Sequence, residues 1–331
     1  MGPNERNDDT FVLDEEKLLR SINSIIKNKS AVNFFVWGGE PLLHFSPLKQ
    51  TVTFLKARFP ESKISVSTNG FLLQKKEIQN FILESGISLQ LSCDGVAQKI
   101  RSNYNPLEND SVSTFLFELA RKNRLVINCV MHNQNYSVNK NIDYFVAWMR
   151  QYSCLETSLD IRFTPFTESD LTPKFNFSGS ELSAFLHEYE MLYVYALLGN
   201  KSSAELNHFA RFPLKIVRKA NLQKCGWEHS NMCAKYASSV ADKSRHIDTK
   251  GNFVSCNLID SGVMPRGKVK KDIPPYCSGC EFAGTRGCYP CPAGDFPQKC
   301  EWKKEWMRFQ KRMLLLRSFV SKKFDNSLES N

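Results

Sequence analysis

The sequence predicts an α/β fold, in which a parallel sheet with helical crossovers is followed by a cysteine-rich segment and a C-terminal helix. Short apolar runs alternate with amphipathic segments up to residue 166, and eight of the eleven cysteines fall between residues 225 and 300. Alternation at this spacing indicates parallel strands in an open sheet or an incomplete (β/α) barrel. In the cysteine-rich segment the hydrophobic periodicity is lost, so we expect a bound metal or cluster to hold it together.

The expected strands are short apolar runs that end near glycine or small polar residues. They are residues 33–37, 62–69, 88–93, 124–131 and 159–166. The segments before and between these runs carry apolar residues at helical spacing. The expected helices are residues 14–28, 46–58, 73–85, 111–122 and 137–151.

Four regions follow from this pattern. We expect a partial barrel over 1–182, a helical linker over 183–224 with a helix at 183–198, a metal-binding domain over 225–300, and a helix with a tail over 301–331. The last helix is expected over 301–320, with a frayed tail after it. One of its faces is apolar and is expected to pack on the barrel; it consists of Trp302, Trp306, Phe309, Met313 and Leu316. Its Lys and Arg face leaves a membrane-surface or nucleic-acid role as the alternative.

Composition excludes several classes of protein. The apolar fraction of 42% and the charged fraction of 24% are those of a globular protein. No apolar run is long enough to span a membrane, and the polar, acidic N-terminus predicts no secretory signal, so we expect a cytoplasmic protein. The net charge of +10 permits nucleic-acid binding, but no sequence signature of such a protein accompanies it.

The first motif with chemical content is Trp37-Gly38-Gly39-Glu40-Pro41, directly after an expected strand. Two glycines there let the backbone approach a ligand closely, and the Glu40 carboxylate can accept hydrogen bonds from an amine. Ligands of parallel βα folds bind at the carboxyl ends of the strands. The alternative is an ordinary turn with a glutamate that caps a helix.

Polar side chains also lie near the ends of the other expected strands. They are Ser65, Ser67, Thr68, Asn69, Ser92, Asp94, Asn128 and Arg162. Because the carboxyl ends of parallel strands share one edge, these side chains are expected to converge on one pocket. Repetition over four strands favours a binding site over capping alone.

Three segments resemble motifs of radical SAM enzymes: FFVWGGEPLLHF, ISVSTNGFLL, and LQLSCDG followed by Arg101. The resemblance covers about residues 14–166. It implies that Gly38, Gly39 and Glu40 hold the amino group of S-adenosyl-L-methionine. It further places Ser92 and Asp94 near the ribose or carboxylate of that cofactor, with Asn128 and Arg162 as weaker candidates.

The cysteine-rich segment offers eight thiolates, which are enough for two four-ligand sites. They are Cys225, Cys233, Cys256, Cys277, Cys280, Cys288, Cys291 and Cys300. A hairpin with its turn at Lys250-Gly251 precedes Cys256. Thiolates suit iron–sulfur clusters or zinc, and a reducing compartment favours metal ligation over disulfides. Two structural zinc sites of four cysteines each are the alternative. The other three cysteines (Cys93, Cys129 and Cys154) are expected to be inert thiols.

This cysteine frame is similar to the SPASM domain of radical SAM peptide-modifying enzymes, which implies two auxiliary 4Fe-4S clusters. The first would take Cys225, Cys233, Cys256 and Cys291, and the second Cys277, Cys280, Cys288 and Cys300. The spacing inside the four-cysteine block departs from the family pattern of two, five and three residues, because here it is two, seven and two. The departure affects the pairing more than the presence of clusters.

One family motif is missing from the sequence. Radical SAM enzymes bind their catalytic cluster through Cys-x3-Cys-x2-Cys near the first strand, whereas this chain has no cysteine before Cys93. The catalytic residues therefore remain unknown. Three explanations stay open: a truncated enzyme, a split enzyme whose second protein supplies the missing part, or a non-catalytic relative.

The resemblance implies radical-mediated modification of a peptide or protein substrate. Asn257 follows Cys256, where sulfatase-maturing relatives carry an acidic residue, so a ribosomal-peptide maturase is favoured. The alternatives are a peptide-binding scaffold that keeps structural iron–sulfur clusters and a zinc-stabilised nucleic-acid-binding protein.

Overall fold

The computed structural model describes residues 13–26, 32–152, 159–165, 175–177, 179–198, 206–209, 213, 247–252 and 301–328. Five strands form one parallel sheet in the order β1-β2-β3-β4-β5. Their bounds are β1 Asn33–Val36, β2 Lys63–Thr68, β3 Ser88–Ser92, β4 Leu125–Met131 and β5 Asp160–Pro165. The strand order follows the chain, as expected for successive βα units.

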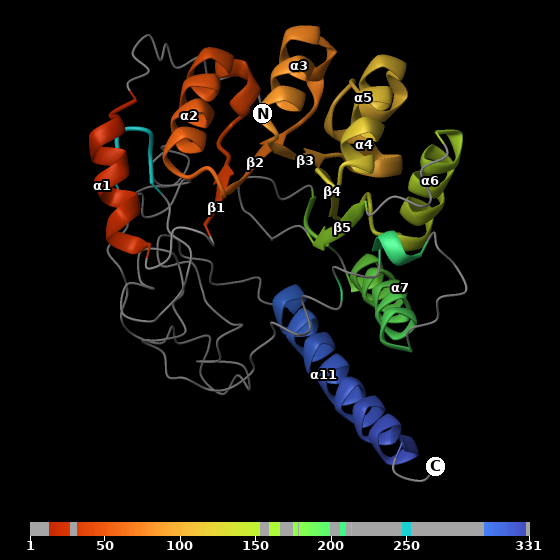
Figure 1. Ribbon diagram of the computed structural model, residues 1–331. Coiled ribbons are helices and arrows are strands. Elements are labelled where there is room, and N and C mark those ends of the chain that lie inside the picture. Colours follow the sequence, from red (N-terminus) through yellow and green to blue (C-terminus); the bar gives the residue numbers. More distant parts are fainter. Residues whose placement is uncertain are drawn as a thin grey trace.

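Helices precede, connect and follow these strands. The α-helices are α1 Glu15–Ile25, α2 Phe45–Arg58, α3 Lys76–Ser85, α4 Gln98–Arg101, α5 Asp110–Arg121, α6 Val138–Gln151, α7 Gly179–Leu198 and α11 Glu301–Leu328. Short 3-10 helices follow three of the strands: η2 Pro41–His44, η3 Phe71–Gln74 and η4 Gly95–Ala97, with η5 Pro106–Glu108 further on. In Figure 1, α2, α3 and α5 line one side of the sheet.

The two faces of the sheet differ in polarity. In β2, β3 and β4, buried residues alternate with half-exposed ones. The buried members, such as Val66, Leu91 and Ile127, belong to one core together with the buried faces of α2, α3 and α5. The half-exposed members are mostly hydroxyl and amide residues, which is unusual because parallel sheets are normally apolar on both faces.

Helix boundaries follow from capping side chains. Asp14 accepts a hydrogen bond from the Lys17 amide at 2.9 Å and so begins α1. Asn109 caps α5 in the same way through the Val112 amide at 3.0 Å. A side-chain oxygen at this position satisfies a backbone donor that has no partner within the helix.

A turn from the C-terminal third packs on α1. The Asp14 amide donates to the Thr249 carbonyl at 3.1 Å, and the Ser21 hydroxyl donates to the Gly251 carbonyl at 2.6 Å. Gly251 has a φ of +73°, and a Cβ there would lie 2.5 Å from the carbonyl carbon of Lys17. The turn expected at Lys250-Gly251 is therefore confirmed, and glycine is required by both the backbone angle and the close approach.

The expected C-terminal helix is confirmed, but it is longer than predicted. It continues to Leu328 through the segment that was expected to be a frayed tail. Its apolar face packs on α7, where Trp306 and Phe309 stack near Phe185 and Tyr189 with ring centroids 5.7–6.2 Å apart. Periodicity predicted which face is buried, but the expected partner was the barrel, whereas the aromatic contacts of this face are made with α7.

Apart from residues 247–252, the cysteine-rich segment lies outside the described residues, and all eight predicted metal ligands lie in its undescribed part. In the part of the chain that the structure describes, no group of three or more His, Cys, Asp or Glu side chains could hold a metal ion. Among the same residues, no helix has the length and apolar character that crossing a membrane requires.

Arg124 joins α3 to the sheet just before β4. Its Nε donates to the Ile87 carbonyl at 2.8 Å, its Nη1 donates to the Leu83 carbonyl at 3.3 Å, and its Nη2 also donates to the Ile82 carbonyl. These carbonyls lie at the C-terminal end of α3 and in the following turn, where helical donors run out, although the Leu83 carbonyl also accepts from the Gly86 amide at 3.4 Å. One guanidinium thus satisfies three backbone acceptors.

We predict that Arg124→Met lowers the free energy of unfolding by about 2–4 kcal/mol, because three carbonyls lose a charged donor at once. Arg121→Met is the matched control, since Arg121 is an exposed residue in the last turn of α5. Urea denaturation followed by circular dichroism measures both variants. Equal stability of the two would contradict this role for Arg124.

Candidate functional site

The carboxyl edge of the sheet brings four of the predicted segments together. The register pairs Ser92 with Asn128 and Asn128 with Arg162, so these three residues form one row across β3, β4 and β5. All three are half-exposed and belong to the polar face of the sheet. The row lies at the end of β3, next to the turns that carry the other predicted site residues.

Glu40 ties the end of β1 to the end of β2. Its Oε1 accepts hydrogen bonds from the Thr68 hydroxyl at 2.8 Å and the Leu42 amide at 3.2 Å, and its Oε2 accepts one from the Asn69 amide at 2.7 Å. A carboxylate has about four acceptor positions, so three are engaged by the protein itself. Glu40 therefore acts first as a brace that fixes the turn after β1.

Gly38 and Gly39 lie in that braced turn and face open space. A Cβ built on either glycine would have no heavy atom within 4 Å apart from its own chain neighbours. Neither glycine needs a left-handed backbone, since neither has a φ between +20° and +160°. The turn thus offers bare backbone beside an open volume, which is the arrangement that lets a ligand approach main-chain groups.

Asp94 joins the turn after β3 to strand β4 by hydrogen bonds, as Glu40 joins the turn after β1 to the end of β2. Its Oδ1 accepts hydrogen bonds from the Val130 amide at 3.0 Å and from Arg101 at 3.2 Å. The side chain of Asp94 is only 4% exposed, whereas that of Arg101 is 40% exposed. The charged group that reaches solvent at this point is therefore the guanidinium of Arg101.

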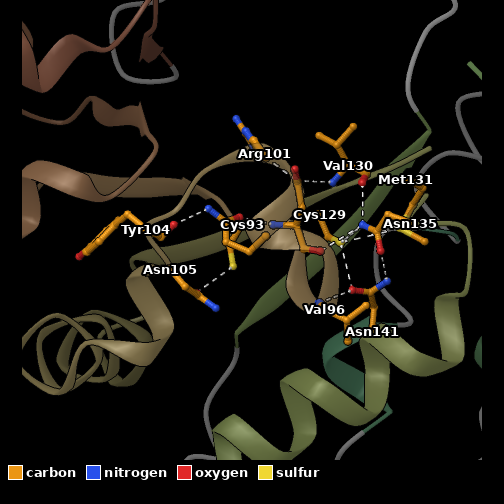
Figure 2. A network of polar contacts seen from close by, with 12 residues as sticks. Cys93, Val96, Arg101, Tyr104, Asn105, Cys129, Val130, Met131, Asn135 and Asn141 are labelled. Atoms are coloured by element: carbon orange, nitrogen blue, oxygen red, sulfur yellow. Dashed lines mark hydrogen bonds and ion pairs between the residues drawn. The ribbon is translucent and has the colours of Figure 1, made fainter. Parts of the chain in front are cut away.

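A buried amide pair holds the turn that contains Asp94. Asn135 donates to the backbone carbonyls of Asp94 and Val130 at 3.1 and 2.9 Å, and Asn141 donates to Asn135 at 2.8 Å. The Oδ1 of Asn141 accepts a hydrogen bond from the Val96 amide at 3.2 Å. Figure 2 shows both amides beside Cys129. No sequence pattern predicted this pair, because its partners at Asp94 and Val96 lie 41 and 45 residues away along the chain.

Gly95 is required by the same network. Its φ is +57°, and a Cβ there would lie 2.0 Å from the Oδ1 of Asn141. Any side chain would therefore displace the amide that holds the turn. The Asp94-Gly95 pair, which the sequence marked as the end of a strand, is fixed by both its carboxylate and its missing side chain.

Arg162 is oriented by its neighbour on the same strand. Its Nε and Nη2 donate to the Asp160 carboxylate at 3.0 and 2.9 Å. The side chain of Arg162 is 26% exposed, and that of Asp160 is 10% exposed. A paired guanidinium on the polar face adds hydrogen-bond donors there with little net charge.

Two cysteines lie in the core behind this edge. Cys93 and Cys129 are free and fully buried. Burial raises the pKa of Cys93 to about 12, and burial likewise raises the pKa of Cys129. Both thiols are therefore protonated at neutral pH, and their prediction as inert core thiols agrees with this environment.

We predict that Glu40→Ala lowers the free energy of unfolding by about 1–3 kcal/mol, because it leaves three donors without their acceptor. Glu84→Ala is the control, since Glu84 is an exposed residue of α3. Amide hydrogen exchange at Leu42 and Asn69 provides the local measurement and should accelerate in Glu40→Ala alone. Unchanged exchange at both amides would show that the brace is not formed in solution.

No protein-family model matches this sequence, and no curated protein matches it either. Among solved structures, the chain resembles native anSMEcpe with bound AdoMet, with a TM-score of 0.54 and 17% identity over 92% of this chain and 90% of the other. It also matches Streptococcus suis SuiB bound to the precursor peptide SuiA, with a TM-score of 0.48 and 16% identity over 76% of this chain and 54% of the other. The first likeness shows that the predicted fold is shared with an S-adenosylmethionine-bound protein.

Proposed function

We propose that this chain is a radical SAM-type protein that takes part in the radical-mediated modification of a peptide or protein. The observation that carries the proposal is the braced Gly38-Gly39 turn at the carboxyl edge of a parallel sheet, with open space beside both glycines. The shared fold with the AdoMet-bound anSMEcpe structure supports it. So does the sequence resemblance of the same segment to radical SAM enzymes.

The residues at this edge fit S-adenosylmethionine. Gly38 and Gly39 would present backbone groups to its amino group, and Glu40 would hold the turn that carries them. The guanidinium of Arg101 is 40% exposed at the neighbouring turn and would face a carboxylate or a hydroxyl. Bound there, S-adenosylmethionine would supply the radical chemistry that the resemblance implies.

The polar face of the sheet would receive the substrate. Ser67 and Gln90 are paired across β2 and β3, and Ser92, Asn128 and Arg162 continue the polar surface toward β5. Hydroxyl and amide groups bond well to the peptide groups of another chain, because each can donate and accept. A peptide substrate is therefore favoured over a purely apolar one.

The cysteine-rich segment would hold two auxiliary clusters, as the SPASM resemblance implies. The turn at Asp248–Asn252 supports this arrangement, since it fixes the chain on α1 four residues before Cys256. The 331 residues contain no cysteine before Cys93, so we propose that ligands for the catalytic cluster come from polypeptide outside them. A scaffold that binds peptides without catalysis is the second candidate, and the missing motif is the observation that favours it.

Substitution of an open glycine tests the cofactor site. We predict that Gly39→Val weakens S-adenosylmethionine binding at least about tenfold, because the new side chain fills the volume that the ligand needs. The free energy of unfolding should stay within about 0.5 kcal/mol of the wild type, since the substitution meets no other group of the protein.

Gly179→Val is the matched control, because Gly179 also faces open space but lies at the start of α7. Isothermal titration calorimetry with S-adenosylmethionine measures all three proteins under anaerobic conditions. Absence of binding by the wild type, or equal affinity in Gly39→Val, would refute the proposed cofactor site.

Metal analysis tests the auxiliary clusters. We predict about eight iron and eight sulfide ions per chain after anaerobic reconstitution, as two four-iron clusters require. Cys277→Ser together with Cys280→Ser should remove about half of the iron, because that pair belongs to one proposed cluster. About two zinc ions per chain without sulfide would instead support the zinc alternative.

A further inference from the structure

The helix α11 is held by one face and presents the other to solvent. Trp306, Phe309 and Met313 are half-buried or buried against α7 and the core. The opposite side carries Arg308, Lys311, Arg312, Leu315 and Phe319, all exposed, which we call the outward face. These positions recur at intervals of three and four residues, so they form one stripe along the helix.

Two large apolar side chains, Leu315 and Phe319, form the C-terminal end of this stripe, after its three cations. Leu315 is 66% exposed and Phe319 is 64% exposed. The two side chains are one helical turn apart, and each could bury on the order of 100 Å² of its surface against a partner. In Figure 1 the C-terminal half of α11 (blue) extends away from the sheet and from α7. The pair is therefore placed where another molecule can reach it.

The charge of the chain is concentrated on this helix. Its 28 residues contain eight Lys or Arg and three Asp or Glu, which gives +5 of the net +10 of the whole chain. Two cations of the outward face form ion pairs, Arg308 with Glu305 and Arg312 with Glu190 of α7, between side chains that are 32–51% exposed. Such pairs contribute little stability, so carboxylates of a partner can replace them at small cost.

The composition of the stripe selects the kind of partner. A helix that inserts into a membrane surface needs a wide apolar face, whereas the outward face has only two apolar residues, next to three cations. The phosphates of a nucleic acid would attract the cations, but they would leave the exposed Leu and Phe in contact with water. A second copy would bring like charges together. A polypeptide with carboxylates around a pair of apolar side chains satisfies both features, as in docking by anchors at positions i and i+4.

We propose that the outward face of α11 is a docking surface for an acidic polypeptide segment that carries apolar side chains. The proposal does not depend on S-adenosylmethionine, because α11 shares no residue with the turn at Gly38-Gly39. The docking proposal and the cofactor-site proposal can therefore be refuted separately. The affinity for S-adenosylmethionine should be the same with and without the acidic segment.

Fluorescence anisotropy of the full chain with a labelled helical probe peptide, built from Leu at i and i+4 with Glu on both flanks, tests the proposal. We predict binding that weakens as salt is raised, a loss of about tenfold in Lys311→Glu, and a comparable loss in the double variant Leu315→Ser, Phe319→Ser. Circular dichroism should show unchanged helix content in these variants.

Two matched controls isolate the stripe. Lys49→Glu makes the same charge change at an exposed site on α2, and Met191→Ser removes an apolar side chain that is 57% exposed on α7. Both should bind the probe like the wild type. Equal loss in Lys49→Glu, absence of probe binding, or binding only to phosphatidylglycerol vesicles or duplex DNA would each overturn the proposal.

Discussion

The structure depends on two carboxylates that join neighbouring strands at the carboxyl edge of the sheet. Glu40 bonds from the turn after β1 to the Thr68 hydroxyl and the Asn69 amide, and Asp94 bonds from the turn after β3 to the Val130 amide. Charged acceptors make stronger hydrogen bonds than neutral ones, particularly where water is partly excluded. Glu40 thus holds the turn in which Gly38 and Gly39 lie beside open space.

This bracing explains how a parallel sheet tolerates a polar face. The hydrophobic core lies between the sheet and helices such as α2, α3 and α5, where alternate residues of β2, β3 and β4 are buried. The other face can then carry Ser, Gln, Asn and Arg, since burial on one side supplies the apolar contact area that holds the strands. A surface of this kind is suited to binding a polar chain.

Segments that are far apart in the sequence pack together in the structure. The turn at 247–252 is hydrogen-bonded to α1 although more than 220 residues separate them in sequence. The apolar face of α11 packs on α7 through stacked aromatic rings, and its outward face stays exposed. The proposed cofactor edge and the proposed docking surface thus belong to different elements, so they can be altered separately.

The alternation of five strands with helices could be predicted from the sequence, because residue periodicity and turn residues such as Gly38 and Gly39 are local signals. The sequence also identified Gly38, Gly39, Glu40 and Asp94 as candidate cofactor-binding residues. The structure was needed to show that the carboxylates of Glu40 and Asp94 accept hydrogen bonds from neighbouring strands, and that Asn135 and Asn141 hold the turn at Asp94. Those partners are set by strand register and by contacts between distant residues, which no local pattern records.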